Sequence, residues 1–172
     1  MRLIACLSFI FVILLIQHAQ AQINVEQPPS GSLSEEQLQT IAADIRKLLE
    51  DPLAPGAEQG RKALWQWITG SPDVTVKVCP NIIGPLTESN YTHKTKLIIL
   101  SVLSSAAYKI ENPDTDSLAE QVNGIKGMLQ AYQVIKEQED ENSTDPFIES
   151  LQKFSQKGEL ASHLRDEVEK CY

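Results

Sequence analysis

Histidine is the side chain that most often serves as an acid, a base or a metal ligand near neutral pH, and the chain has three. His163 is followed at the i+3 and i+4 positions by Asp166 and Glu167, so these side chains share one helix face. Such a set could hold a metal through nitrogen and oxygen ligands. The same spacing is typical of a solvated helix face with a local ion pair. We expect that second arrangement, with no metal site and no cofactor.

His93 lies at the expected start of another helix, beside Lys94 and Lys96. The first N–H groups of a helix have no intrahelical acceptors, so a helix N-terminus attracts negative charge. His93 and the two lysines could therefore join in a small anion site. An ordinary exposed first turn of a helix would have the same composition.

Two tryptophans are candidates for binding another molecule. Trp65 and Trp67 lie about 200° apart around a helix, so one buried face cannot cover both equally. We expect Trp65 in the core, and Trp67 could then be a half-exposed recognition residue, because tryptophan is enriched at binding hot spots. A second packing partner, such as the valines of 74–78, would instead bury Trp67. Together with Tyr108, the tryptophans could also line a cavity for a small apolar ligand.

The cysteines predict a disulfide. Cys6 lies in an N-terminal segment that we expect to be removed, which leaves Cys79 and Cys171. In an oxidising compartment two such thiols commonly pair, and only one intramolecular pairing exists here. No CxxC pair is present, and two cysteines alone make half of a zinc site. We therefore predict a structural bond that ties the C-terminus to the middle of the chain.

Catalytic and calcium-binding motifs are missing from the chain. It contains no GxSxG sequence and no phosphate-binding glycine loop outside a helical pattern. A calcium loop beginning at Asp140 would place Asp145 where glycine is required and Leu151 where a bidentate carboxylate is required. A loop beginning at Asp114 fails as well, since Leu118 would occupy a ligand position.

The first 21 residues have the three parts of a secretory signal peptide. A positive start at Arg2 precedes a nearly continuous apolar run of 14 residues, Leu3 to Ile16, and small residues at Ala19 and Ala21. The run is too short to span a bilayer, which takes about 20 residues. We expect cleavage between Ala21 and Gln22. The ending Ala-Gln-Ala-Gln is similar to the signals of many exported proteins of Gram-negative bacteria, so a periplasmic or extracellular product is predicted.

The product of that cleavage is acidic. Removal of residues 1–21 from a chain of 172 leaves 151 residues, and the loss of Arg2 changes the formal net charge from −8 to −9. Such a surface repels phosphate backbones and anionic membranes, so nucleic acid and membrane surfaces are poor partners. The sequons at Asn90 and Asn142 are glycosylation sites only in a eukaryotic host, and we expect them to be unmodified.

The element pattern predicts an all-α, single-domain bundle of five or six helices with one extended connector. Residues 22–33 contain prolines and a glycine and are expected to form a flexible leader. The helical domain of residues 34–172 begins with the capping box Ser34 to Gln37. Apolar spacing predicts helices at approximately 34–51, 55–69, 91–110, 116–136, 145–157 and 160–171, with residues 74–79 as the connector.

The helix at 91–110 should be the centre of the bundle. It is apolar nearly all round, which in a globular protein indicates burial by neighbours on several sides. Its small residues allow those neighbours to approach closely: Ser101, Ser104, Ser105, Ala106 and Ala107. Gly124 and Gly127 in the next helix permit the same close crossing.

These observations lead to three hypotheses of function. The first is an exported, non-enzymatic protein that binds another exported protein, in the manner of an inhibitor or an immunity protein. The second is a helical bundle that holds a small apolar ligand. The third is an enzyme whose site the sequence does not reveal.

Overall fold

The computed structural model describes residues 22–26, 28, 31–139 and 144–172; the predicted signal peptide and the Asn142 sequon lie outside these residues. The described part of the chain contains helices and no strand, so the all-α prediction is confirmed. The helices are α1 (Glu35–Glu50), α2 (Ala57–Gly70), α3 (Pro80–Glu88), α4 (Lys94–Glu111), α5 (Ser117–Gln138), α6 (Pro146–Gln156) and α7 (Leu160–Cys171).

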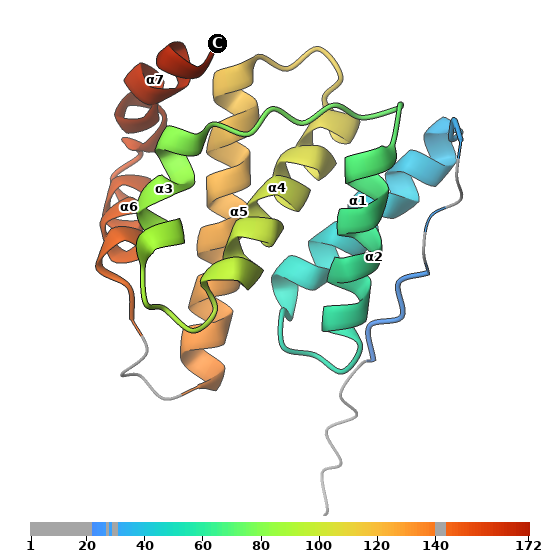
Figure 1. Ribbon diagram of the computed structural model, residues 1–172, viewed down its shortest axis with the longest axis horizontal. Coiled ribbons are helices and arrows are strands. Elements are labelled where there is room, and N and C mark those ends of the chain that lie inside the picture. The colour runs from blue at the N-terminus through green and yellow to red at the C-terminus, as the bar shows by residue number, and fades with distance from the viewer. Residues whose placement is uncertain (1–21, 27, 29–30, 140–143) are drawn as a thin grey trace, which may run out of the picture.

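Helices α4 and α5 form the central pair of the bundle (Figure 1). Helices α1, α2 and α3 all contact α4, while α1, α6 and α7 contact α5. In the picture α1 and α2 lie on one side of the central pair, and α3, α6 and α7 lie on the other. The prediction that the apolar helix near residues 91–110 is central is confirmed, because α4 is buried along most of its length.

The central helices approach closely because small residues face each other. A Cβ atom on Gly124 would collide with the hydroxyl of Ser105, and one on Gly127 would collide with the hydroxyl of Ser104. The Ser104 hydroxyl donates to the carbonyl of Asn123 at 2.9 Å, and the Ser105 hydroxyl donates to the carbonyl of Glu120 at 3.2 Å. Both serine hydroxyl groups therefore have a hydrogen-bond acceptor on the other helix, and neither is buried without a partner.

Several helix starts agree with the sequence signals. Ser34 and Gln37 form the predicted capping box of α1, with the Ser34 N–H donating to Gln37 Oε1 at 2.8 Å. Asp116 caps α5 by accepting the N–H of Ala119. Asp145 caps α6, and Pro146 occupies the first turn, where its missing N–H is no loss.

Helix α3 was not predicted, so the expected count of five or six helices is too low. It begins after Cys79 with Pro80 in its first turn, and it contains Pro85. A glycine and a proline inside nine residues argue against a helix in sequence terms. Burial of Ile82 and Leu86 against the neighbouring helices outweighs that local penalty.

The segment from Ser71 to Cys79 joins α2 to α3 and contains the predicted extended connector, and side chains of α5 form hydrogen bonds with part of its backbone. The Lys77 N–H donates to Glu120 Oε1 at 3.1 Å, and Gln121 Nε2 donates to the Lys77 carbonyl. Glu120 is only 4% exposed. These side chains take the place of the partner strand that a lone extended segment lacks.

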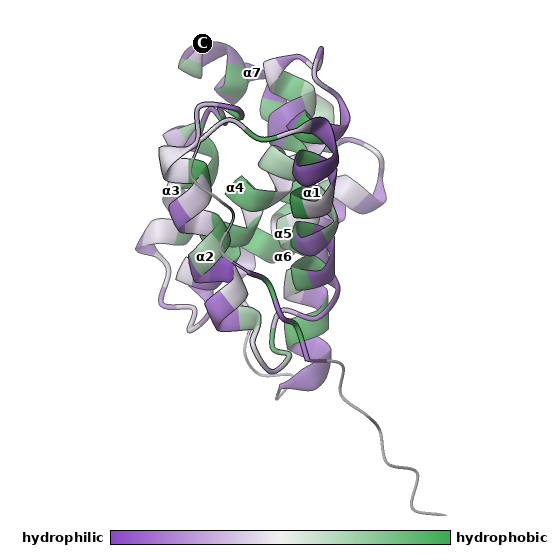
Figure 2. Cartoon of the chain, turned by 90° about the vertical axis from the view of Figure 1, so that its right-hand side faces the viewer, coloured by the Kyte–Doolittle hydropathy of each residue, from purple (hydrophilic) through white to green (hydrophobic). Residues whose placement is uncertain are grey.

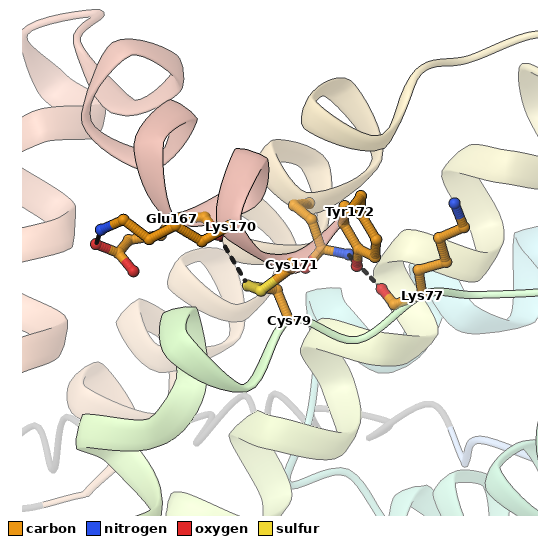
Figure 3. The surroundings of a disulfide bond; sticks show 7 residues. Lys77, Cys79, Glu167, Lys170, Cys171 and Tyr172 are labelled. Carbon is orange, nitrogen blue, oxygen red and sulfur yellow. Dashed lines mark hydrogen bonds and ion pairs between the residues drawn. A yellow bond between two sulfur atoms is a disulfide. The ribbon is translucent and has the colours of Figure 1, made fainter.

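The disulfide follows directly after the connector. Cys79 and Cys171 are bonded across 92 positions of sequence, with their Cα atoms 5.7 Å apart, as the sequence analysis predicted. The bond joins the start of α3 to the end of α7 (Figure 3). Beside it, the Lys77 ammonium lies 4.7 Å from the centre of the Tyr172 ring, a distance at which a cation and an aromatic face attract each other.

The described residues of the leader pack against the bundle. Ile23 and Val25 are partly buried on the core, and the Ile23 N–H donates to the Pro55 carbonyl at 3.0 Å. The leader runs beside α2 in the view of Figure 1. Helix α2 itself starts at Ala57 and not at Pro55 as predicted, since Gly56 has a φ of 87° that lies outside the helical region.

Hydrophobic residues gather where helices face one another and hydrophilic residues on the outer faces (Figure 2). The fully buried side chains come from most of the helices and include Leu48, Leu64, Leu103, Tyr132 and Ile148. Within the residues that the structure describes, no helix has both the length and the apolar character needed to cross a membrane.

Candidate functional site

A pocket of about 280 Å³ opens at the start of α2. We call it the cationic pocket, because its lining contains Arg61 of α2 and Lys96 of α4 together with the loop that joins α1 to α2. Its other lining residues are Pro52, Leu53, Ala54, Gly56, Ala57, Glu58 and Gln59. The same loop borders a second open pocket of about 550 Å³, which Asp51 and Gln138 also line. Two pockets therefore share the loop at this end of the molecule.

Arg61 is held in the wall of the pocket. Only 8% of it is exposed, and its Nη1 donates to the Pro52 carbonyl at 3.1 Å. A guanidinium group has five N–H donors, so further donors remain without a partner among the described residues. Burial lowers the pKa of Arg61, while the charge of Glu58 acts in the opposite direction.

The first turn of α2 contributes open backbone donors. Its N-cap is Gly56, which has no side chain and makes no capping hydrogen bond. The Ala57 N–H donates to the Ala54 carbonyl at 3.0 Å, and the Gly60 N–H donates to the Gly56 carbonyl at 2.9 Å. Glu58 and Gln59 lie between these two residues, and their N–H groups have no acceptor within the described parts of the chain. Such orphan donors at a helix N-terminus favour negative charge.

Lys96 brings a second positive charge to the pocket from α4. Lys96 is half-buried, and its side chain makes no hydrogen bond or ion pair with any residue in the described ranges. Burial lowers its pKa most, and the nearby charge of Arg61 lowers it further. Glu139 and Glu58 oppose that shift. The pocket thus holds two cations that repel each other, and the acidic residue Glu58 also lines it.

The small anion site that the sequence allowed around His93 is not assembled in the structure. His93 Nε2 lies 2.6 Å from Glu139 Oε2, and its ring packs edge-on against Tyr91. Lys94 donates to the carbonyls of Thr87 and Ser89. Of His93, Lys94 and Lys96, only Lys96 lines the cationic pocket.

The prediction that Trp65 lies in the core was wrong, and of the two alternatives for Trp67 the structure has the buried one. Trp67 is the buried residue, with 7% exposed, and Trp65 is half-buried at the edge of the core. Trp67 follows Leu64 by three positions and precedes Ile68, so these residues share the face that packs on α1 and α4. Tyr108 is half-buried on α4. None of the three aromatic residues lines the cationic pocket.

The remaining predicted candidates serve structural roles or lie apart. The His163 ring stacks on Phe154 with centroids 3.8 Å apart, which joins α7 to α6. Among the described residues, no group of three or more His, Cys, Asp or Glu is placed to hold a metal. Asn90 is exposed in the turn between α3 and α4.

Sequence reasoning missed Arg61. Its signal was a charged residue on the apolar face of α2, three positions before Leu64 and seven before Ile68. A charged residue at such a position must find a hydrogen-bonding partner when the face is buried, and the Pro52 carbonyl supplies one.

Comparison of the chain with protein-family models, with curated proteins and with solved structures found no match.

Proposed function

We propose that this protein is a non-enzymatic binding protein of an exported compartment, and that it recognises another exported protein with the hollowed end around the cationic pocket. The observation that carries the proposal is the pairing of two pockets on one loop with an open cluster of hydrogen-bond donors. In an acidic chain, a local cationic pocket is a distinct feature that a partner can recognise.

The loop that forms this surface is held in place before any partner binds. Arg61 fixes the Pro52 carbonyl, and the Ile23 N–H fixes the Pro55 carbonyl. At the start of the loop, the Asp51 N–H donates to the Lys47 carbonyl, and the Asp51 carboxylate accepts from Gln138 at 3.3 Å. A surface ordered in advance loses less conformational entropy on binding.

A small apolar ligand inside the bundle has less support. The pocket between the connector and the α4–α5 pair has a volume of only about 10 Å³, although Val76, Val102 and Ile125 line it. That space is at the lower limit for one water molecule. The close crossing at Gly124 and Gly127 explains why so little room remains there.

Affinity capture tests the proposed function. The disulfide-bonded protein is immobilised and exposed to the exported fraction of its own cells, in parallel with Lys96→Glu and with the control Lys62→Glu. Lys62 is exposed on α2 and does not line the pocket. We expect one protein to be retained by the wild type and by the control, lost with Lys96→Glu, and able to form a complex of fixed stoichiometry when purified. Equal retention by all three baits, or no such complex, would refute the proposal.

The compartment is tested separately by the N-terminus of the protein isolated from cells. Mass spectrometry of the exported fraction should identify Gln22 as the first residue. Intact Met1 in a cytoplasmic pool would refute export and would remove the oxidising environment assumed for Cys79 and Cys171.

A further inference from the structure

We infer that the cationic pocket is an oxyanion site, which binds a carboxylate or phosphate group between Arg61, Lys96 and the first turn of α2. The idea that this oxyanion belongs to a protein partner rests on the proposed function. The chemistry of the site itself rests only on the geometry of these residues.

The donors of the pocket come from three independent parts of the fold. Arg61 supplies guanidinium N–H groups that remain after its bond to Pro52. The N-terminus of α2 supplies the N–H groups of Glu58 and Gln59, which have no acceptor among the described residues. Lys96 supplies an ammonium group from α4 with no ion pair of its own in the described residues. Oxyanions have several lone pairs in different directions, so they suit a site with donors on several sides.

The positive charges of Arg61 and Lys96 also favour the binding of an anion. Two cations near each other in a half-buried pocket raise the free energy of the unliganded protein. An oxyanion between Arg61 and Lys96 would remove that repulsion and would satisfy the open donors at the same time. The net charge of −8 does not prevent this, because salt screens exposed charges beyond about 8 Å at physiological ionic strength.

Glu58 limits the affinity of the site. It is exposed in the first turn of α2 and lies within electrostatic range of both Arg61 and Lys96, but it forms no ion pair within 4.0 Å of either. It lines the pocket and therefore competes with an incoming anion for the same positive charges. Removal of this carboxylate should strengthen anion binding.

Nuclear magnetic resonance titration tests the inference on the disulfide-bonded protein. Sodium phosphate and sodium acetate are added in separate series at constant ionic strength, with sodium chloride as the reference salt. We expect saturable shifts of the Glu58, Gln59 and Arg61 Nε resonances with at least one oxyanion and none with chloride. The two series distinguish a phosphate site from a carboxylate site.

Variants then assign the binding to the pocket. Lys96→Gln should weaken binding about tenfold, because it removes one charge-assisted hydrogen bond. Lys96→Arg should restore most of the affinity, and Glu58→Gln should increase it. Lys62→Gln makes the same change of charge on an exposed part of α2 and should have no effect beyond a small change in screening.

The outcomes separate this inference from the proposed function. Oxyanion shifts equal to those in chloride, or equal losses in Lys96→Gln and Lys62→Gln, would overturn the oxyanion site even if a protein partner is captured. Saturable shifts lost only with Lys96→Gln would support the site even if no partner is found. Arg61→Lys provides a further check, since it keeps the charge of the buried wall and reduces the number of donors.

Discussion

At the scale of single residues, burial was decided by neighbours and not by residue type. Trp67 is buried and Trp65 is not, although both are tryptophans of the same helix. Glu120 is a carboxylic acid yet is among the most buried polar residues, because its Oε1 accepts the N–H of Lys77 from the connector. Burial raises the pKa of Glu120 above its ordinary value of 4.5, and the hydrogen bond and the charges of Lys109 and Lys77 only partly oppose it.

The raised pKa of Glu120 predicts how stability depends on pH. A carboxyl group that binds its proton more tightly in the folded chain contributes less to the free energy of unfolding as the pH rises above about 4.5. Glu120→Gln keeps an acceptor for Lys77 and removes the buried charge. We expect it to raise the free energy of unfolding near pH 7, with the gain shrinking towards pH 4. Urea denaturation of this variant and of the exposed control Glu169→Gln measures the effect, and an equal gain in both would contradict it.

Replacement of glycine by alanine should lower stability at Gly124 and raise it at Gly70. Gly124→Ala puts a Cβ against the Ser105 hydroxyl and the Ser101 carbonyl, so we expect a loss of about 1–3 kcal/mol of stability from overpacking. Gly70 at the end of α2 has no heavy atom near the added carbon, and Gly70→Ala should stabilise by up to about 1 kcal/mol. Chemical denaturation of both variants provides the comparison. Losses of the same size would show that the close crossing is not the cause.

At the scale of elements, the helix caps differ in the hydrogen bonds that they form outside their own helix. Asp145 is 4% exposed, accepts the N–H groups of Phe147 and Ile148, and also accepts the hydroxyl of Ser89. It therefore joins α6 to the turn after α3. Asp116 is exposed, and among the described residues its carboxylate accepts only the Ala119 N–H at the start of α5.

This difference predicts unequal costs for the same substitution. Asp116→Ala should cost about 1 kcal/mol, the usual value for an exposed cap. Asp145→Ala should cost about 2 kcal/mol or more, because it also leaves the Ser89 hydroxyl without its acceptor. Thermal unfolding followed by circular dichroism at 222 nm measures both. Equal shifts in Tm would mean that the bond to Ser89 adds nothing.

At the scale of the whole molecule, the disulfide and the leader connect distant parts of the chain. The bond between Cys79 and Cys171 holds α7 against α3, and the described leader residues hold the loop at the start of α2. Cys79 is fully buried, and its Sγ lies 3.4 Å from the Glu167 carbonyl of α7. The C-terminal helix is thus fixed at the end where helices commonly fray.

Loss of this bond should destabilise the whole domain. Cys171→Ser opens a loop that spans 92 positions of sequence, and we expect a loss of about 2–5 kcal/mol and a clear fall in Tm. Reduction of the wild-type protein should produce the same fall. Hydrogen exchange should locate the largest loss of protection in α7. An unchanged Tm after verified reduction would show that packing alone holds α7 in place.

The sequence by itself determined those features that depend on nearby residues. Apolar spacing and caps such as Ser34, Asp116 and Asp145 predicted the all-α class and most helix starts, because capping and amphipathic burial act within a few positions. The cysteine pair was equally predictable, since only one pairing is possible if Cys6 belongs to a signal peptide that is cleaved. Both predictions needed no knowledge of how the helices pack.

The tertiary structure alone decided the features that depend on residues distant in sequence. Helix α3 exists despite Pro85 because its neighbours bury Ile82 and Leu86, and the connector is satisfied by Glu120 and Gln121 of α5. Arg61 and Lys96 are 35 positions apart and meet only because α2 packs on α4. Periodicity indicates that a helix has a buried face, but packing chooses which neighbour covers it and which side chains share a pocket.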